Sequence, residues 1–238
     1  AFAMRDAELA DPAHVPIDAA RLASKSYARD LWRSYDPARS SPGAAAAVGD
    51  TVYLCAVDRD GNAASLIQSI YQGFGSGIVV DGTGIILQNR GVAFSLDDDH
   101  PNRLEPGKRP RHTLMPGMLL RDGNLLGPFG TQGGDAQAQV HLQLVTNLVD
   151  YAMDPQAAIE APRWLAGVGQ GDDPRTVELE AGFPPATIEH LTGRGHRIRE
   201  RGVWESGFGH AQMILRDHGS GLLQGGADPR ADGVALGY

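Results

Sequence analysis

Short apolar runs, each ended by Gly, Asp or Asn, recur along the chain from residue 51 onward. The pattern predicts a strand over residues 51–57 and a second over 63–70, joined by the turn at 58–62. Apolar residues occupy both faces of the first strand. Val52, Leu54 and Ala56 lie on one face, and Tyr53, Cys55 and Val57 lie on the other. We therefore expect an interior strand that is covered on both sides.

The same pattern predicts further strands and several helices. Two more hairpins are expected over residues 78–87 and 113–129, and further strands over 176–179, 196–203 and 210–215. Short helices are expected over 17–22, 26–35, 154–161 and 184–192. Mixed elements of this kind, with many Gly and Pro turns, indicate an α/β or α+β architecture.

The clearest helix is predicted over about residues 135–153. Its apolar stripe and the residues that widen it are Val140, Leu144, Leu148 and Tyr151, then Leu142, Val145 and Val149. A surface this broad implies burial against a sheet. Gly133 and Gly134 directly precede the helix. Their amides could hold a developing oxyanion at the positive end of the helix, or the pair could simply form a tight turn, and the two roles are compatible.

Residues 36–47 are rich in Pro, Ser, Gly and Ala and have the composition of an exposed linker. Thr51 follows this segment at the head of the first strand. Such a Thr can be a nucleophile if the bond before it is cut, because its new α-amino group then serves as the base. The alternatives are an ordinary surface loop and an ordinary strand residue.

Composition narrows the classes of partner. The chain has 238 residues, enough for one large domain or two small ones. A net charge of -8 argues against binding to nucleic acid or to an anionic membrane surface, and no apolar run approaches a membrane span. The N-terminus has neither an initiator Met nor the features of a signal peptide, so an export signal could have been removed. The expected location is therefore left open between the cytoplasm and the periplasm or secretion.

Metal and nucleotide sites are not expected. The single cysteine, Cys55, allows no intramolecular disulfide and no multi-thiolate site. The acidic run 97–99 with His100 fits a solvated loop better than a cation site, and His190 and His196 share no helical register. The glycine loop at 73–77 leads into a strand rather than a helix, so it does not fit a phosphate-binding loop.

Several of these motifs occur together, in an order and at spacings that resemble the γ-glutamyltranspeptidase family of N-terminal nucleophile hydrolases. The matching segments are Thr51, Val57 to Ala63, Gly73 to Ile78, Gly84-Ile85, Pro106 to Pro110, Gly133-Gly134 and Ala227 to Arg230. The resemblance covers residues 51–238, which look like the family's small catalytic subunit. Residues 1–50 look like the C-terminal tail of its large subunit with an exposed linker.

The resemblance implies an α+β fold, the αββα four-layer sandwich, and a precursor that cuts itself between Asp50 and Thr51. Thr51 would be the nucleophile and Ser69 a second hydroxyl beside it. The amides of Gly133 and Gly134 would stabilise the oxyanion. This chemistry needs no cofactor and no metal.

The resemblance also shows departures in the part that binds substrate. Where well-known γ-glutamyl enzymes have an Asn, a Gln and an Asp, this sequence has Tyr71, Arg90 and Ala93. The paired serines near the substrate carboxylate become His112 and Thr113. Because Arg suits a carboxylate, the expected substrate is a small acidic acyl amide that is hydrolysed rather than efficiently transferred.

The implied partner is the remainder of the large subunit, possibly as another chain, in a heterodimer or a dimer of heterodimers. The alternative is a non-catalytic or truncated relative that serves as a binding or assembly subunit.

Overall fold

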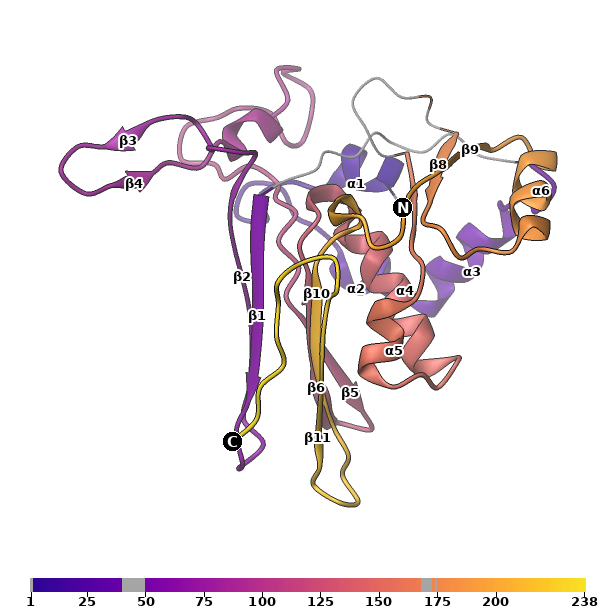
Figure 1. Ribbon diagram of the computed structural model, residues 1–238. Coiled ribbons are helices and arrows are strands. Elements are labelled where there is room, and N and C mark those ends of the chain that lie inside the picture. Colours follow the sequence, from indigo (N-terminus) through magenta and orange to yellow (C-terminus); the bar gives the residue numbers. More distant parts are fainter. Residues whose placement is uncertain (1, 40–49, 168–172, 174) are drawn as a thin grey trace.

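The fold stacks two β layers and one helical layer (Figure 1). The computed structural model describes residues 2–39, 50–167, 173 and 175–238. The first layer is the hairpin of β1 (Asp50–Val57) and β2 (Ala63–Tyr71). It lies against a four-stranded antiparallel sheet, and helices α4 and α5 cover the other face of that sheet.

The four-stranded sheet has the order β11-β10-β6-β5. Its strands are β5 (Gly117–Arg121), β6 (Asn124–Thr131), β10 (Ala211–Arg216) and β11 (Leu223–Ala227). A separate sheet joins β7 (Trp164–Ala166), β8 (Thr176–Leu179) and β9 (Arg197–Glu200), with β8 and β9 parallel. The short hairpin of β3 (Val79–Val80) and β4 (Ile85–Ile86) projects from the end of the β1-β2 layer (Figure 1).

Side-chain caps fix the starts of several helices. The helices are α1 (Phe2–Glu8), α2 (Ala19–Leu22), α3 (Lys25–Arg33), α4 (Gln137–Val149), α5 (Pro155–Glu160) and α6 (Pro185–Gly193), with 3-10 turns η1 (Arg90–Ala93), η2 (Gly134–Ala136) and η3 (Ser206–Phe208). Asp18, Ser24 and Asp154 each accept a backbone amide at the first turn of α2, α3 and α5.

Helix α4 packs on the four-stranded sheet with a narrower stripe than its sequence predicts. Val140 and Leu144 are buried in the core. The other residues buried there are Phe129, Ala136, Ile159, Leu165, Phe208, Ala211 and Met213. Leu142, Val149 and Tyr151 are exposed instead, and the helix begins two residues later and ends four residues earlier than predicted. The prediction that these three residues join the buried face is therefore wrong in this chain.

The first strand is covered on only one side. Tyr53 is buried and its ring lies against Gly130 of β6, where a Cβ atom would come within 2.3 Å of the ring. On the opposite face Val52 is 62% exposed, and Leu54 and Leu66 are exposed beside it. The prediction of cover on both sides is thus wrong for the part of the chain that the structure describes.

Most of the predicted linker, residues 40–47, lies outside the described residues. In the described part of the chain, no helix is long and apolar enough to cross a membrane.

Candidate active site

Strand pairing brings Thr51 and Ser69 together. Thr51 lies opposite Ser69 in the register of β1 and β2, and the register shifts between Asp50 and Thr51. The Thr51 Oγ1 donates a hydrogen bond of 3.0 Å to the Ser69 Oγ. That oxygen also accepts the Tyr71 amide at 2.9 Å. Thr51 is only 8% exposed, so the two hydroxyls form a largely buried pair at the irregular end of the hairpin.

The chain then bends at Tyr71, which has a φ of 80°. A non-glycine residue in this region is uncommon, and such strain is often kept where it serves a site. The Tyr71 ring lies against the Arg90 guanidinium, whose Cζ is 5.0 Å from the ring centroid. Both side chains line one cavity of about 370 Å³.

The four expected substrate-binding residues all line this cavity, namely Tyr71, Arg90, His112 and Thr113, and Ala93 lines it as well. Arg90 is 8% exposed, and its Nη1 donates to the Thr113 Oγ1 at 3.4 Å. Its Nη2 is buried and has no hydrogen-bond partner among the described residues. Burial lowers the pKa of Arg90, but a guanidinium keeps its charge in proteins. The cavity wall thus holds a cation with an unused donor.

His112 adds a neutral imidazole to the same wall. Its Nδ1 accepts the Leu114 amide at 3.2 Å, which places the proton of the neutral ring on Nε2. Partial burial and then the charges of Arg90 and Arg109 lower the pKa of His112. At neutral pH the ring is therefore a hydrogen-bond donor without a charge.

The sequence reasoning missed two carboxylates of the wall, Asp6 and Asp135, and the Arg5 guanidinium that pairs with both. Arg5 of α1 bonds the Asp135 carboxylate, and its Nη2 lies 2.7 Å from Asp6. Asp6 in turn lies 3.2 Å from Arg111. These charges compensate one another, so among the described lining residues Arg90 is the guanidinium without a carboxylate partner. No local pattern signals such pairs, because their members lie far apart in the sequence.

The two expected oxyanion glycines form a buried turn between β6 and α4. Gly133 has a φ of 135° and Gly134 a φ of 56°, conformations that residues with a Cβ rarely adopt. Among the described residues, neither amide nitrogen has a hydrogen-bond acceptor. Asp135, the next residue, lines the cavity together with Tyr71, two residues after Ser69. Residues close in sequence to the turn and to the hydroxyl pair therefore line the same cavity, whereas Thr51, Ser69, Gly133 and Gly134 themselves are not among its lining residues.

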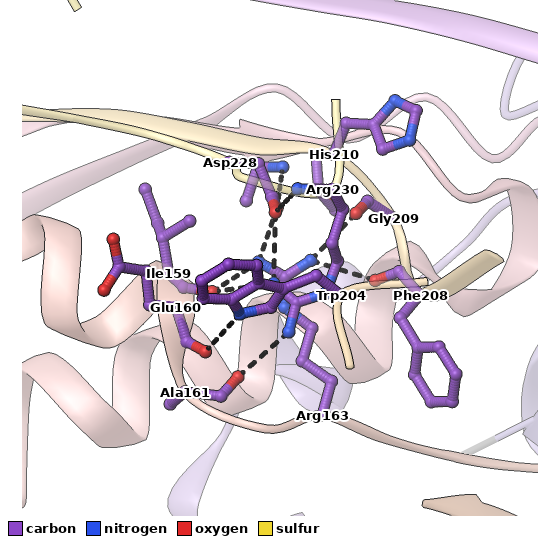
Figure 2. Close-up of polar contacts among 12 residues, drawn as sticks. Ile159, Glu160, Ala161, Arg163, Trp204, Phe208, Gly209, His210, Asp228 and Arg230 are labelled. Carbon is purple, nitrogen blue, oxygen red and sulfur yellow. Dashed lines mark hydrogen bonds and ion pairs between the residues drawn. The ribbon is translucent and has the colours of Figure 1, made fainter. Parts of the chain in front are cut away.

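A buried network of charges supports the backbone beside this turn (Figure 2). Arg163 Nη2 donates to Asp228 at 2.6 Å, and its Nη1 donates to the carbonyls of Phe208 and Gly209, each at 2.9 Å. Gly209 adjoins the turn, since a Cβ there would lie 2.7 Å from the Gln132 carbonyl oxygen. The network ties this backbone to Asp228, the residue that follows β11.

Arg230 completes the network from the last of the matching motifs. Its Nη1 donates to the second Asp228 oxygen at 3.0 Å and its Nε to Glu180 at 2.8 Å. The segment at 225–230, predicted as a final turn, thus forms the end of β11 followed by this buried anchor.

Within the described ranges no group of three His, Cys, Asp or Glu side chains could hold a metal ion. The acidic residues 97–99 are exposed, as expected for a solvated loop.

Comparison with known proteins gives one family. The model of the family described as Gamma-glutamyltranspeptidase matches residues 1–238. The chain is 45% identical to the "Glutathione hydrolase-like YwrD proenzyme" of Bacillus subtilis and 43% identical to the "Oxamate amidohydrolase proenzyme" of Klebsiella pneumoniae, over 99% and 100% of its length. It spans about 45% of the length of each of these relatives.

Solved structures agree. The crystal structure of a cephalosporin acylase from Bacillus halodurans matches all of this chain and 44% of its own, with a TM-score of 0.84 and 40% identity. A gamma-glutamyltranspeptidase from Pseudomonas nitroreducens matches 78% of this chain and 98% of its own, with a TM-score of 0.67 and 27% identity. The expected αββα fold class is confirmed, and the described residues contribute both β layers and one α layer. The chain belongs to the gamma-glutamyltranspeptidase family.

Proposed function

We propose that the chain is part of an autoprocessed amide hydrolase or acyltransferase in which Thr51 is the nucleophile. Cleavage between Asp50 and Thr51 would free the α-amino group that serves as the base. The Thr51 to Ser69 hydrogen bond and the irregular register at Asp50 support this assignment. Several relatives are named proenzymes, which supports processing.

The proposed reaction runs through an acyl-enzyme. The Thr51 hydroxyl attacks the amide carbonyl while its α-amino group takes the hydroxyl proton, and that proton then passes to the leaving amine. The amides of Gly133 and Gly134 stabilise the tetrahedral oxyanion, and losing one such donor typically costs about 100- to 1000-fold in rate. Water or an acceptor amine then releases the acyl group. No metal or cofactor takes part.

The acyl group of the substrate carries a carboxylate that Arg90 binds. The observation that carries this proposal is the buried Nη2 of Arg90, which has an unused donor at the cavity and no partner in the described part of the chain. Thr113 and the neutral His112 add donors beside it. Ala93 offers no carboxylate for a substrate ammonium group. Small acidic acyl amides fit this wall, whether γ-glutamyl, glutaryl-type or oxamate-like, and we propose their hydrolysis over efficient transfer.

The proposed partner is the remainder of the large subunit. The exposed apolar face of Val52, Leu54 and Leu66 supports this, since a strand with two apolar faces needs a second cover. The Pseudomonas nitroreducens chain matches 78% of this chain, and residues 51–238 make up about the same fraction of it. This agreement supports a boundary near Thr51. We propose a heterodimer, alone or paired into a dimer of heterodimers.

The test of this function uses the complete protein. Mass spectrometry identifies the N-terminal residue of the small fragment, and a screen follows acyl amides that differ only in the α-amino group, such as γ-glutamyl and glutaryl p-nitroanilides. We expect Thr51 at the N-terminus and faster turnover of the glutaryl compound. Equal turnover of the two would contradict the assigned acyl pocket. An uncut, inactive chain would indicate a non-catalytic relative instead.

A further inference from the structure

The turn of Gly133 and Gly134, here called the oxyanion turn, is followed by the buried carboxylate of Asp135. This carboxylate pairs with a residue on the other side of the proposed cleavage site. Asp135 is 7% exposed and comes directly after Gly134. It accepts a hydrogen bond from Arg5, which lies 130 residues earlier in helix α1. The pair joins the segment before Thr51 to the turn that follows β6.

Both flanks of this turn are held. Glycine adopts positive φ without strain, so the path of this two-glycine turn depends on the contacts on either side of it. Upstream, the Gln132 amide donates to the His210 carbonyl at 3.2 Å, and the Thr131 hydroxyl donates to the Gln132 carbonyl at 2.7 Å. Downstream, the tie comes from Arg5 through Asp135. Arg5 therefore contributes to the shape of the turn from outside it.

The pair also has an electrostatic effect. Asp135 brings a negative charge to within one residue of an amide proposed to stabilise an oxyanion. Two like charges at a poorly solvated site disfavour each other strongly. Arg5 compensates this carboxylate, and its side chain is itself largely buried.

We propose that Arg5 is a positioning residue for the oxyanion turn, acting through Asp135 both to hold Gly133 and Gly134 and to neutralise the carboxylate beside them. This inference rests on the proposed function, in which those amides meet the oxyanion. It follows that the segment before the cut stays part of the active site after cleavage. Loss of Arg5 lowers kcat more than it raises KM, because the turn acts on the transition state.

Because Arg5 both holds the turn and neutralises Asp135, the kcat values of single and double variants should fall in an unusual order. Arg5→Ala removes the guanidinium that pairs with the buried Asp135 carboxylate, whereas Asp135→Asn removes the negative charge together with the tie. We expect kcat to fall about 100-fold in Arg5→Ala and about 10-fold in Asp135→Asn. In the double variant kcat rises about 10-fold above that of Arg5→Ala alone, and Arg5→Lys, which keeps the charge, also recovers part of it. A purely structural role would not make the second substitution beneficial.

The experiment measures kcat and KM of the processed complete enzyme on glutaryl p-nitroanilide, with the processed fraction counted by mass spectrometry. The matched control is Arg21→Ala, which removes an exposed pair with Glu8 in the same N-terminal segment. It should leave kcat within about twofold of wild type. If Arg5→Ala is not processed, the role of Arg5 is tested with Arg5→Lys and Asp135→Asn instead. Each of these variants is expected to have a kcat about 10-fold below that of wild type.

Wild-type kcat in the Arg5 variants, or a double variant no faster than Arg5→Ala, would overturn this inference. A wild-type protein that is uncut and turns over neither p-nitroanilide would overturn the proposed function instead. The two failures are thus separate results.

Discussion

At the scale of single residues, the decisive feature is a cation with an unused donor. Burying a charge is costly unless it is paired, and Arg90 is buried with a long contact to Thr113 and the face of Tyr71 beside it. A buried guanidinium that lacks a hydrogen-bond partner costs stability, and a substrate carboxylate bound to its Nη2 would supply that partner. We therefore attribute acyl specificity to Arg90.

Replacing Arg90 tests that attribution. Charge-assisted hydrogen bonds contribute about 1.5–3 kcal/mol, so Arg90→Gln should lower kcat/KM for glutaryl p-nitroanilide by about 10- to 100-fold. The matched substrate is butyryl p-nitroanilide, which lacks the carboxylate and should lose less than about threefold. Steady-state kinetics on both compounds check this. An equal loss on the two would show that Arg90 acts on something other than the acyl carboxylate.

At the scale of elements, β11 shows why part of the fold escaped the sequence pattern. Glycine is depleted in strands, so Gly225-Gly226 reads as a turn. Yet Gly226 is required there, because a Cβ would lie 2.9 Å from Ile159 and 3.0 Å from the Pro155 backbone. Strand β8 was predicted with its observed limits, since Thr176, Val177 and Leu179 are apolar or β-branched. Close packing between distant elements leaves no such local signal.

The candidate site divides in the same way. Thr51, Ser69 and the two glycines were predicted as site residues from motifs that lie on strand ends and turns, and the structure brings Thr51 and Ser69 within a hydrogen bond. The pairing of Arg5 with Asp135 could not be foreseen, because residues so far apart in sequence meet only through the fold.

The turn before α4 gives a prediction at this scale. Gly133→Ala should displace the two amides, because its φ of 135° is strained for alanine. We expect kcat to fall at least about 10-fold with KM within about threefold, which steady-state kinetics can measure. Gly123→Ala is the matched control: its φ of 79° is also positive, but it lies in the exposed turn between β5 and β6. An equal effect of the two substitutions would assign the loss to folding rather than to the oxyanion turn.

At the scale of the whole molecule, a buried cluster of charges ties residues 228–230 to the backbone beside the candidate active site. Figure 2 shows Arg163, Asp228 and Arg230, and Glu180 pairs with Arg230 in the same cluster. Removing one partner of a buried pair strands the other charge, at a cost of about 3–5 kcal/mol. Asp228→Asn should therefore lower the midpoint of urea unfolding markedly. Asp30→Asn, which breaks an exposed pair with Arg33, should change it little. Similar midpoints would mean that the network does not stabilise the fold.

The uncovered face of β1 also belongs to this scale. The apolar pattern of β1 predicts two buried faces, and Val52 and Leu54 would be buried only if another part of the protein covered them. The chain spans less than half the length of the two curated relatives named above, and the proposed remainder of the large subunit would supply this cover.

We propose above all that Thr51 is a masked N-terminus that becomes both nucleophile and base. The most direct measurement is intact-mass spectrometry of the complete protein beside its Thr51→Ala variant, with turnover of glutaryl p-nitroanilide followed on the same samples. We expect a wild-type small fragment that begins at Thr51 and turns the compound over, and a Thr51→Ala chain that stays uncut and inactive. Normal cleavage or normal turnover in the Thr51→Ala variant would contradict the assignment of Thr51 as the nucleophile.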